Sequence, residues 1–189
     1  MVCLVYAYAE EVNSLKQAVS QLYLKQKLYW LNWRPGLKLK PIPNKVKLII
    51  NLGFAGSLNG KFSCGEVCQV SLFLAKENGY LLKAKSSKSL TKLKLLLKDL
   101  PAATLYTSSL PVVDAKKKQA LALETQVDLV DMEAFWLLQQ AQTLNIPFCC
   151  LKVVSDFADA EAKQMVKANQ HYYAQVLAKA VLPLLEALA

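Results

Sequence analysis

A strand–helix–strand pattern in the last third of the chain constrains the fold more than any other feature. Residues 127–132 predict a strand, residues 133–144 a helix with one apolar face, and residues 146–154 a second strand that is almost wholly apolar. A continuous apolar run of that length is typical of a strand covered on both faces, as in α/β proteins. The pattern therefore predicts an α/β protein with helices on both faces of a sheet.

Two carboxylates stand where these predicted strands end. Glu133 and Asp156 come just past the carboxyl ends of the two strands, which we expect to be adjacent in the sheet. Open α/β sheets bind their ligands in that position. Two acids in one crevice can divide a reaction, one holding a substrate hydroxyl and the other giving up a proton.

The rest of the chain alternates strands with helices. We expect strands at 2–7, 46–52, 67–75 and 103–107, one or two short strands within 29–39, and helices at 10–24, 90–100, 114–124 and 160–188. Asn78-Gly79 predicts a hairpin turn, residues 53–58 a tight turn, and Pro183 a kink or early end of the last helix. Asp114 is the expected N-cap of its helix. The alternation predicts one domain, residues 1–189, folded as a three-layer α/β sandwich with a central mixed sheet.

Composition indicates a globular protein of the cytoplasm. Hydrophobic residues make up 54% of the chain, which excludes a disordered protein. The sequence has no apolar run of about 18 residues or more, so we expect no membrane span. The first residues run from an apolar segment into Glu10 and Glu11 without a basic start, which favours a first strand over a signal peptide.

Cysteine and histidine usage argues against a metal site. The five cysteines are Cys3, Cys64, Cys68, Cys149 and Cys150. Most of them lie in apolar segments, which is typical of buried free thiols in a reducing compartment. The chain has a single histidine, His171, and no second Cys or His pair to accompany Cys64 and Cys68. We therefore expect no bound metal and no cofactor.

The net charge of +9 leaves two interpretations open. Basic residues in 24–47 are interleaved with Tyr29, Trp30 and Trp33, as on a nucleic-acid-binding surface. The alternative is a solvated face, since lysine alternates with leucine in residues 37–40 as in an amphipathic strand. We favour the solvated face and expect no nucleic-acid partner, because no nucleic-acid-binding motif accompanies the charge.

Three segments, in order, resemble the nucleoside phosphorylase and nucleosidase superfamily. The first is the opening strand with its acidic pair, and the second is Asn51 to Gly56, which is similar to a Gly-x-Ala-Gly turn of that family. The third runs from Asp131-Met132-Glu133-Ala134 to Ser155-Asp156. The resemblance is closest to the 5′-methylthioadenosine/S-adenosylhomocysteine nucleosidases, and it implies the nucleoside phosphorylase-like form of the α/β sandwich.

The resemblance implies a role for each acid. Asp156 would donate a proton to the departing purine, with Ser155 beside it, and Glu133 would accept hydrogen bonds from the ribose hydroxyls. Met132 would pack against the sugar, and Asp131 belongs to the same motif. Glu11 would activate the attacking water, whereas phosphorolytic relatives have a glycine-rich, arginine-bearing loop there to hold phosphate.

Backbone contacts are implied at two further places. Ala55 and Gly56 would let backbone groups approach the nucleophile and ligand. Val112 would pair with the adenine edge, because Pro111 has no N–H. Phe54 departs from the pattern, since relatives usually have a small hydroxyl residue there that helps to hold the water.

The predicted function is hydrolysis of the N-glycosidic bond of a 5′-modified adenosine, such as methylthioadenosine or adenosylhomocysteine, by a homodimer. The segment from residue 111 to 118 also resembles the hopanoid-associated nucleosidases, which accept a bulky 5′ group. The alternatives are a purine nucleoside phosphorylase and a protein that binds nucleosides or nucleic acid without turnover.

Overall fold

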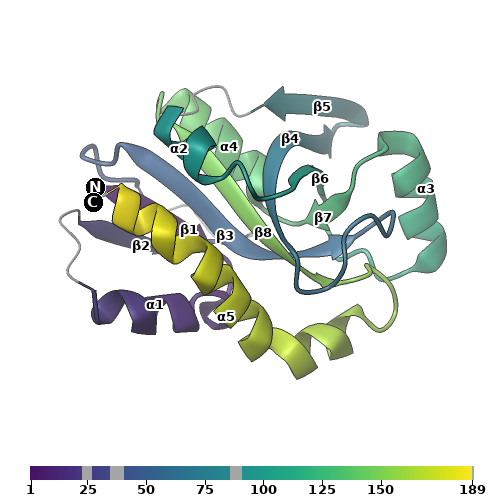
Figure 1. Cartoon of the computed structure of the whole chain (residues 1–189). Coiled ribbons are helices and arrows are strands. Elements are labelled where there is room, and N and C mark those ends of the chain that lie inside the picture. Colours follow the sequence, from purple (N-terminus) through teal and green to yellow (C-terminus); the bar gives the residue numbers. More distant parts are fainter. Residues whose placement is uncertain (23–26, 35–40, 86–90, 189) are drawn as a thin grey trace.

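The computed structural model describes residues 1–22, 27–34, 41–85 and 91–188 (Figure 1). Its strands are β1 (Val2–Tyr6), β2 (Leu28–Asn32), β3 (Leu48–Ser57), β4 (Val67–Glu77), β5 (Tyr80–Lys85), β6 (Ala102–Thr107), β7 (Leu129–Asp131) and β8 (Phe148–Asp156). A short 3-10 helix, η1 (Ala9–Glu11), precedes α1 (Asn13–Ser20), and the other helices are α2 (Thr91–Leu96), α3 (Ala115–Thr125), α4 (Ala134–Thr143) and α5 (Ala162–Ala187).

The described strands form one mixed, eight-stranded sheet. Strands β2, β1, β3 and β8 are parallel to one another, whereas β4 is antiparallel to both β8 and β5. Strand β6 pairs with β4 in parallel, and β7 pairs with both β6 and the end of β3. The pairings β3–β8–β4–β6–β7–β3 therefore close a ring, and the sheet curls around on itself.

Helices cover both faces of this sheet, which confirms the predicted α/β sandwich. On one face, α1 and α5 enclose an apolar core to which Leu151 of β8 and Leu177 of α5 contribute (Figure 1). On the other face, α4 places Phe135 and Leu138 against a second core that includes Phe73 of β4. Burial of such side chains contributes about 1.5–3 kcal/mol each, so the two cores fix the sheet from both sides.

Strand β8 has the burial that its apolar sequence predicts. All nine residues of the strand are buried. It lies between β3 and β4, at the centre of the sheet. The buried strand nevertheless carries Lys152 in its middle and Ser155 and Asp156 at its end.

The expected tight turn at residues 53–58 is wrong, because β3 stays extended to Ser57. Gly53 pairs with Lys152 and Ala55 with Val154 of β8, and the register shifts between Ala55 and Gly56. Small residues mislead here, since glycine is typical of turns but also of strands that other groups approach closely. The segment therefore belongs to the sheet, and its glycines lie beside Glu11, Lys152 and Asp156.

Three other features differ from expectation, two of them in helices and one in the pairing of strands. The first helix is split, with η1 ending at Glu11 and α1 spanning only Asn13–Ser20. Helix α5 continues through Pro183 to Ala187 instead of ending early. Strands β7 and β8 are not adjacent, because β7 pairs with β3 and β6 and β8 pairs with β3 and β4.

Two local predictions are confirmed. Asn78 and Gly79 both have positive φ, of 50° and 83°, in the hairpin between β4 and β5. Asp114 accepts a hydrogen bond from the backbone N–H of Lys117 and so caps α3. The part of the predicted 29–39 strand region that follows Arg34 lies outside the described residues.

The cysteines are free, and Cys64 alone among them is only half-buried. None of the helices in the described part of the chain combines the length and the hydropathy that a membrane span requires.

Candidate functional site

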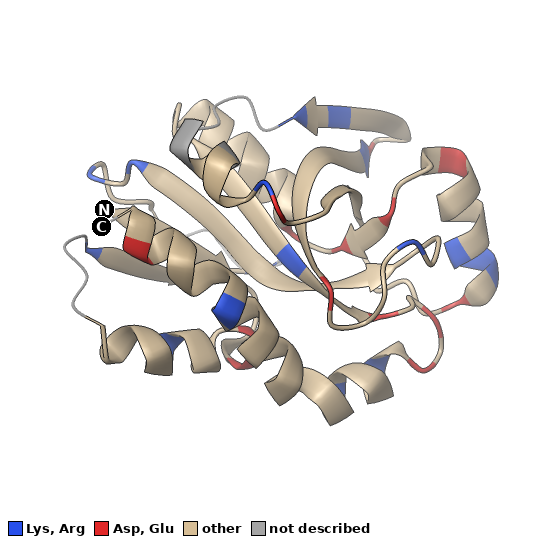
Figure 2. Ribbon diagram, in the orientation of Figure 1, with Lys and Arg blue, Asp and Glu red and all other residues tan. Residues whose placement is uncertain are grey.

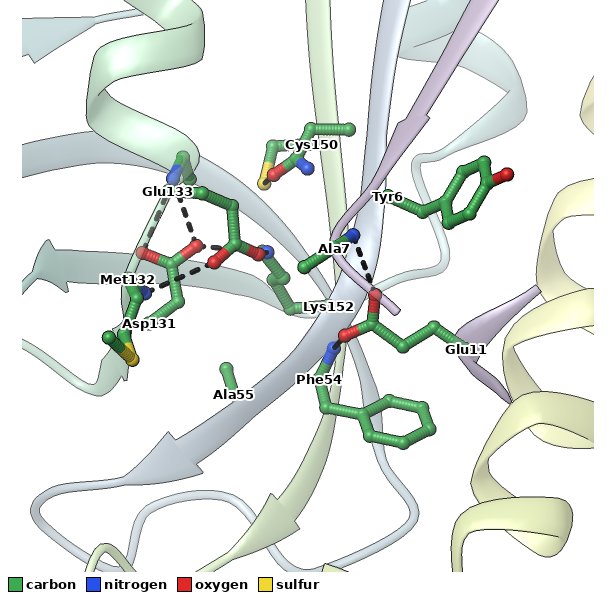
Figure 3. Close-up of polar contacts among 12 residues, drawn as sticks. Tyr6, Ala7, Glu11, Phe54, Ala55, Asp131, Met132, Glu133, Cys150 and Lys152 are labelled. Atoms are coloured by element: carbon green, nitrogen blue, oxygen red, sulfur yellow. Dashed lines mark hydrogen bonds and ion pairs between the residues drawn. The ribbon is translucent and has the colours of Figure 1, made fainter. Parts of the chain in front are cut away.

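Glu11, at the end of η1, is buried and held by backbone N–H groups from the segment after β1 and from β3. Its Oε2 accepts from Ala7 at 2.9 Å and from Tyr8 at 3.0 Å, just after β1. Its Oε1 accepts from Phe54 of β3 at 3.2 Å (Figure 3). Burial raises the pKa of Glu11, although these N–H groups and the charge of Lys152 act in the opposite direction. The carboxyl is therefore fixed in place and more basic than an exposed glutamate.

Lys152 of β8 is the cation of the site, and none of its side chain is exposed. Its Nζ lies 2.9 Å from Asp131 Oδ2 and 2.7 Å from Glu133 Oε1 (Figure 3). Burial alone would lower the pKa of Lys152, but the surrounding carboxylates of Asp131 and Glu133 raise it well above its usual value. Lys152 is therefore a permanent positive charge in the middle of an apolar strand.

Asp131 connects this cation to the neighbouring elements. Its Oδ1 accepts from the hydroxyl of Thr107 at 2.7 Å, and its Oδ2 accepts from the N–H of Ala134, the first residue of α4, at 3.1 Å. Thr107 in turn accepts from the N–H of Phe135 at 3.0 Å. The carboxylate thus ties β6, β7 and the start of α4 to Lys152.

Glu133 lies at the N-cap position of α4 and is also buried. Besides its bond to Lys152, it accepts a hydrogen bond from the backbone N–H of Met132 at 3.3 Å. Burial raises its pKa to about 7, and the negative charges of Asp131 and Glu11 add to that effect while Lys152 opposes it. Glu133 is therefore divided between its protonated and ionised forms near neutral pH.

Gly53 lies between Glu11 and the Lys152 group. A Cβ at this position would be 3.0 Å from Glu11 Oε1 and 3.2 Å from Lys152 Nζ. Any side chain here would fill the gap between the base and the cation. Gly53 therefore allows the two halves of the charged cluster to face each other.

Asp156 ends β8 and is held by a second set of bonds. Its Oδ2 accepts from the hydroxyl of Ser155 at 2.6 Å, and its Oδ1 accepts from the N–H of Ala158 at 2.8 Å. The Ser155 hydroxyl also lies 3.4 Å from the carbonyl of Ala55. A Cβ on Gly56 would be only 2.8 Å from Asp156 Oδ1, so glycine is needed for this close approach.

The remaining predicted residues lie around these two groups. Met132 is half-buried beside Glu133. Val112 is half-buried and packs against an apolar cluster that includes Ala158, in the loop that holds Asp156. The structure thus places Glu11, Asp131 and Glu133 around Lys152, and Ser155 and Asp156 beside Ala55 and Gly56.

The Phe54 ring does not point at the Glu11–Lys152 gap. It packs edge-on against the ring of Tyr173 on α5, with ring centroids 5.8 Å apart. Only the backbone of Phe54 contacts Glu11. The bulky side chain of Phe54 therefore does not enter the gap beside Gly53, between Glu11 and Lys152.

Lys152 and Gly53 are the two members of the site that sequence reasoning missed. A signal for Lys152 exists, because a lysine within an otherwise apolar strand is rarely buried without an acidic partner. Across the described residues, no group of three or more His, Cys, Asp or Glu side chains is arranged to hold a metal ion.

Comparison with known proteins identifies the family. The model of the Phosphorylase superfamily matches residues 39–186, and the chain belongs to that superfamily. A search of curated proteins finds no match.

Solved structures show the same fold at low sequence identity. A futalosine hydrolase of Helicobacter pylori is 16% identical, with a TM-score of 0.78, over 96% of this chain and 95% of its own. A mutant 5′-methylthioadenosine/S-adenosylhomocysteine nucleosidase (MTAN) of H. pylori, with 5′-methylthioadenosine in its active site, is 14% identical, with a TM-score of 0.80 over 96% of each chain. The MTAN of Chlamydia trachomatis is 21% identical, with a TM-score of 0.73 over 97% and 95%.

The contact between Gly56 and Asp156 predicts a strongly coupled pair of variants. Gly56→Ala should lower the free energy of unfolding by about 1–3 kcal/mol, because the added methyl overpacks the site. Gly56→Ala in an Asp156→Ala background should cost less, since the shortened side chain removes the 2.8 Å contact and leaves the one with Ala158 Cβ at 3.0 Å. Urea unfolding of the four proteins measures this coupling, and strictly additive costs would contradict the geometry.

The raised pKa of Glu133 predicts a pH-dependent stability. Between its usual value of 4.5 and its folded value of about 7, the folded state binds more protons than the unfolded state. The free energy of unfolding should therefore fall as pH rises through that window. Unfolding measured from pH about 5 to 8 should show a shallower fall for Glu133→Gln than for the wild type. Equal slopes for the two proteins would contradict the prediction.

Proposed function

We propose that this protein is a nucleosidase that hydrolyses the N-glycosidic bond of a purine nucleoside, with a 5′-modified adenosine as substrate and adenine as product. Breaking this bond develops positive charge on the ribose, as in other glycoside hydrolyses. Catalysis then needs an acid for the base, a group that holds the sugar and a water nucleophile. The two groups of acids described above supply these three functions.

Asp156 is the proposed acid. The Ser155 hydroxyl and the Ala158 N–H orient its carboxyl group. Its side chain is slightly exposed, so it can reach a ring nitrogen of the base. General acid catalysis by a positioned carboxyl contributes about 10²–10⁴-fold to a rate. We propose that Val112 and Ser155 line the same base pocket.

Glu133 is the proposed ribose ligand, with Met132 packing against the sugar. An ionised carboxylate accepts hydrogen bonds from hydroxyl groups and stabilises the positive charge that develops nearby. In the structure one oxygen of Glu133 is bonded to Lys152. That bond favours the ionised form that the ribose hydroxyls need. Asp131 acts by holding Lys152.

Glu11 is the proposed base for water, and it is the observation that carries the proposal. Three N–H groups hold it in a buried position across the Gly53 gap from Lys152. A water in that gap would meet an acceptor on one side and a cation on the other. Deprotonation by Glu11 then delivers hydroxide to the sugar, while the base leaves with the proton of Asp156.

The charge of the site argues against phosphorolysis. Glu11, Asp131 and Glu133 surround a single cation, whose charge two of them already neutralise. A phosphate would meet the carboxylate of Asp131 and the ionised fraction of Glu133 beside a cation that they already pair with. The only arginine of the sequence, Arg34, is exposed and lies outside the Lys152 group. Water is the nucleophile that this electrostatic arrangement favours.

A protein that binds nucleosides or nucleic acid without turnover has less support. Its basis is Phe54 together with the basic surface, and the ring of Phe54 packs on Tyr173 away from the Glu11–Lys152 gap. In the ribbon view, lysine and arginine residues of the described chain are spread over helices, strands and loops and are interspersed with acids (Figure 2). The similar solved structures, MTANs and a futalosine hydrolase, support a nucleosidase, but the substrates in their names differ. We also propose a homodimer, which sedimentation would test.

Base release is the direct test of this function. The purified protein should release adenine and free sugar from at least one of adenosine, deoxyadenosine, methylthioadenosine and adenosylhomocysteine without phosphate, as measured by chromatography, and inosine tests the base preference. Asp156→Asn and Glu11→Gln should each lower kcat by about 100-fold or more. Glu10→Gln is the matched control, because Glu10 is the exposed neighbour of Glu11 and should leave kcat unchanged. Release only in the presence of phosphate would identify a phosphorylase instead.

A further inference from the structure

A single peptide group links Lys118 of α3 to Asp156. The carbonyl of Phe157 accepts a hydrogen bond from Lys118 Nζ at 2.5 Å, and the N–H of Ala158 donates to Asp156 Oδ1 at 2.8 Å. This carbonyl and this N–H are the two ends of one planar peptide unit. A contact that fixes the carbonyl therefore also fixes the direction of the N–H that Asp156 accepts.

The backbone of Ala158 is strained and has to be held in place. Its φ of 51° lies in the left-handed region, which residues with a Cβ rarely adopt. Such a conformation persists where the surrounding structure supports it. Ala158 is buried in an apolar cluster with Leu58 and Val130, and its Cβ lies close against Gly56. Packing thus holds the side chain of Ala158, and the bond from Lys118 holds the carbonyl before it.

The start of α3 places Lys118 beside this loop. Asp114 caps the helix through the N–H of Lys117, and its carbonyl accepts from the N–H of Lys118 at 2.9 Å. Figure 1 shows the start of α3 next to the loop that joins β8 to α5. Within the described part of the chain, no carboxylate forms a salt bridge with Lys118. The carbonyl of Phe157 is thus the acceptor that the structure gives to this charge.

A cation at the carbonyl strengthens the hydrogen bond at the other end of the peptide. Hydrogen bonds in series polarise one another, and a bond from a charged donor is stronger than one from a neutral donor. The N–H that reaches Asp156 then carries more positive charge. When the departing base takes the proton of Asp156, a carboxylate forms, and this N–H stabilises its negative charge.

We propose that Lys118 is a positioning residue for Asp156. Through the peptide between Phe157 and Ala158, it orients the N–H that holds the carboxyl group and stabilises the carboxylate that forms on proton transfer. In this role Lys118 contacts neither the base nor the sugar. The inference rests on the proposed function, because it assigns the lysine to the same reaction.

A cycle of variants separates this role from a purely structural one. Lys118→Met removes the charge but keeps a long, unbranched side chain that suits a helix, and Lys118→Arg keeps the charge. Each is made in the wild type and in an Asp156→Ala background, where the N–H of Ala158 has lost this acceptor. Lys117→Met is the matched control, because Lys117 is the exposed neighbour of Lys118 on the same helix.

Lys118→Met should lower kcat for base release by about 10-fold and change KM by about 2-fold or less, since a charged hydrogen bond is strong but this one is partly exposed to solvent. Lys118→Arg should recover most of the loss, and Lys117→Met should resemble the wild type. In the Asp156→Ala background, Lys118→Met should change kcat by about 2-fold or less. An equal loss in both backgrounds, or an effect on KM alone, would overturn the proposal.

Hydrogen exchange of the Ala158 amide tests the same link without a substrate. Lys118→Met should speed this exchange, measured by NMR, by about 10-fold in the wild type and by less in the Asp156→Ala background. If the wild-type protein releases no base, the proposed function fails, and the exchange alone decides whether Lys118 acts on Asp156. Acceleration that depends on Asp156 supports the inference. An unchanged rate, or equal acceleration in both backgrounds, overturns it.

Discussion

The salt bridges of Lys152 are the interaction on which the site depends. A fully buried ammonium group is costly unless carboxylates accept its charge, and Asp131 and Glu133 do so at 2.9 and 2.7 Å. Lys152 comes from β8, whereas Asp131 ends β7 and accepts hydrogen bonds from Thr107 of β6 and from the N–H of Ala134, and Glu133 is the N-cap of α4. The same pairs therefore join the centre of the sheet to α4 and set the charge that faces Glu11.

Small residues in β3 make this arrangement possible. Because Gly53 has no Cβ, the gap between Glu11 and Lys152 stays open. Because Gly56 has none, Asp156 can approach the strand. Strand β3 runs between β1 and β8. It therefore separates Glu11 from Asp156 and keeps each at its own end of the site. Backbone geometry and electrostatics thus act together, and neither the acids nor the glycines alone would define the site.

The parts of this architecture that were predictable from sequence are those with a local signal. The largely apolar sequence of β8, the Asn78-Gly79 hairpin and the Asp114 cap each follow from short-range chemistry, and all three agree with the structure. Glycines at residues 53 and 56 misled the prediction, because a turn and a closely approached strand share the same composition. The insertion of β3 between β7 and β8, with which it pairs on either side, has no local signal in the sequence, because contacts between distant residues decide it.

The acids of the site were recognisable in the sequence because they resemble a family motif, and their roles stay predictions. Lys152 was missed because its meaning depends on partners that are 19 and 21 residues away in the sequence, at Glu133 and Asp131. The raised pKa of Glu133 likewise follows only from burial in three dimensions.

A double-mutant cycle on Lys152 and Asp131 tests the central claim most directly. The free energy of unfolding is measured for the wild type, Lys152→Met, Asp131→Asn and the double variant. Lys152→Met should cost about 3–5 kcal/mol, because it leaves buried carboxylates unpaired, and Asp131→Asn should cost less in that background than in the wild type. Additive costs, or a Lys152→Met protein as stable as the wild type, would contradict the claim that this cation holds the site together.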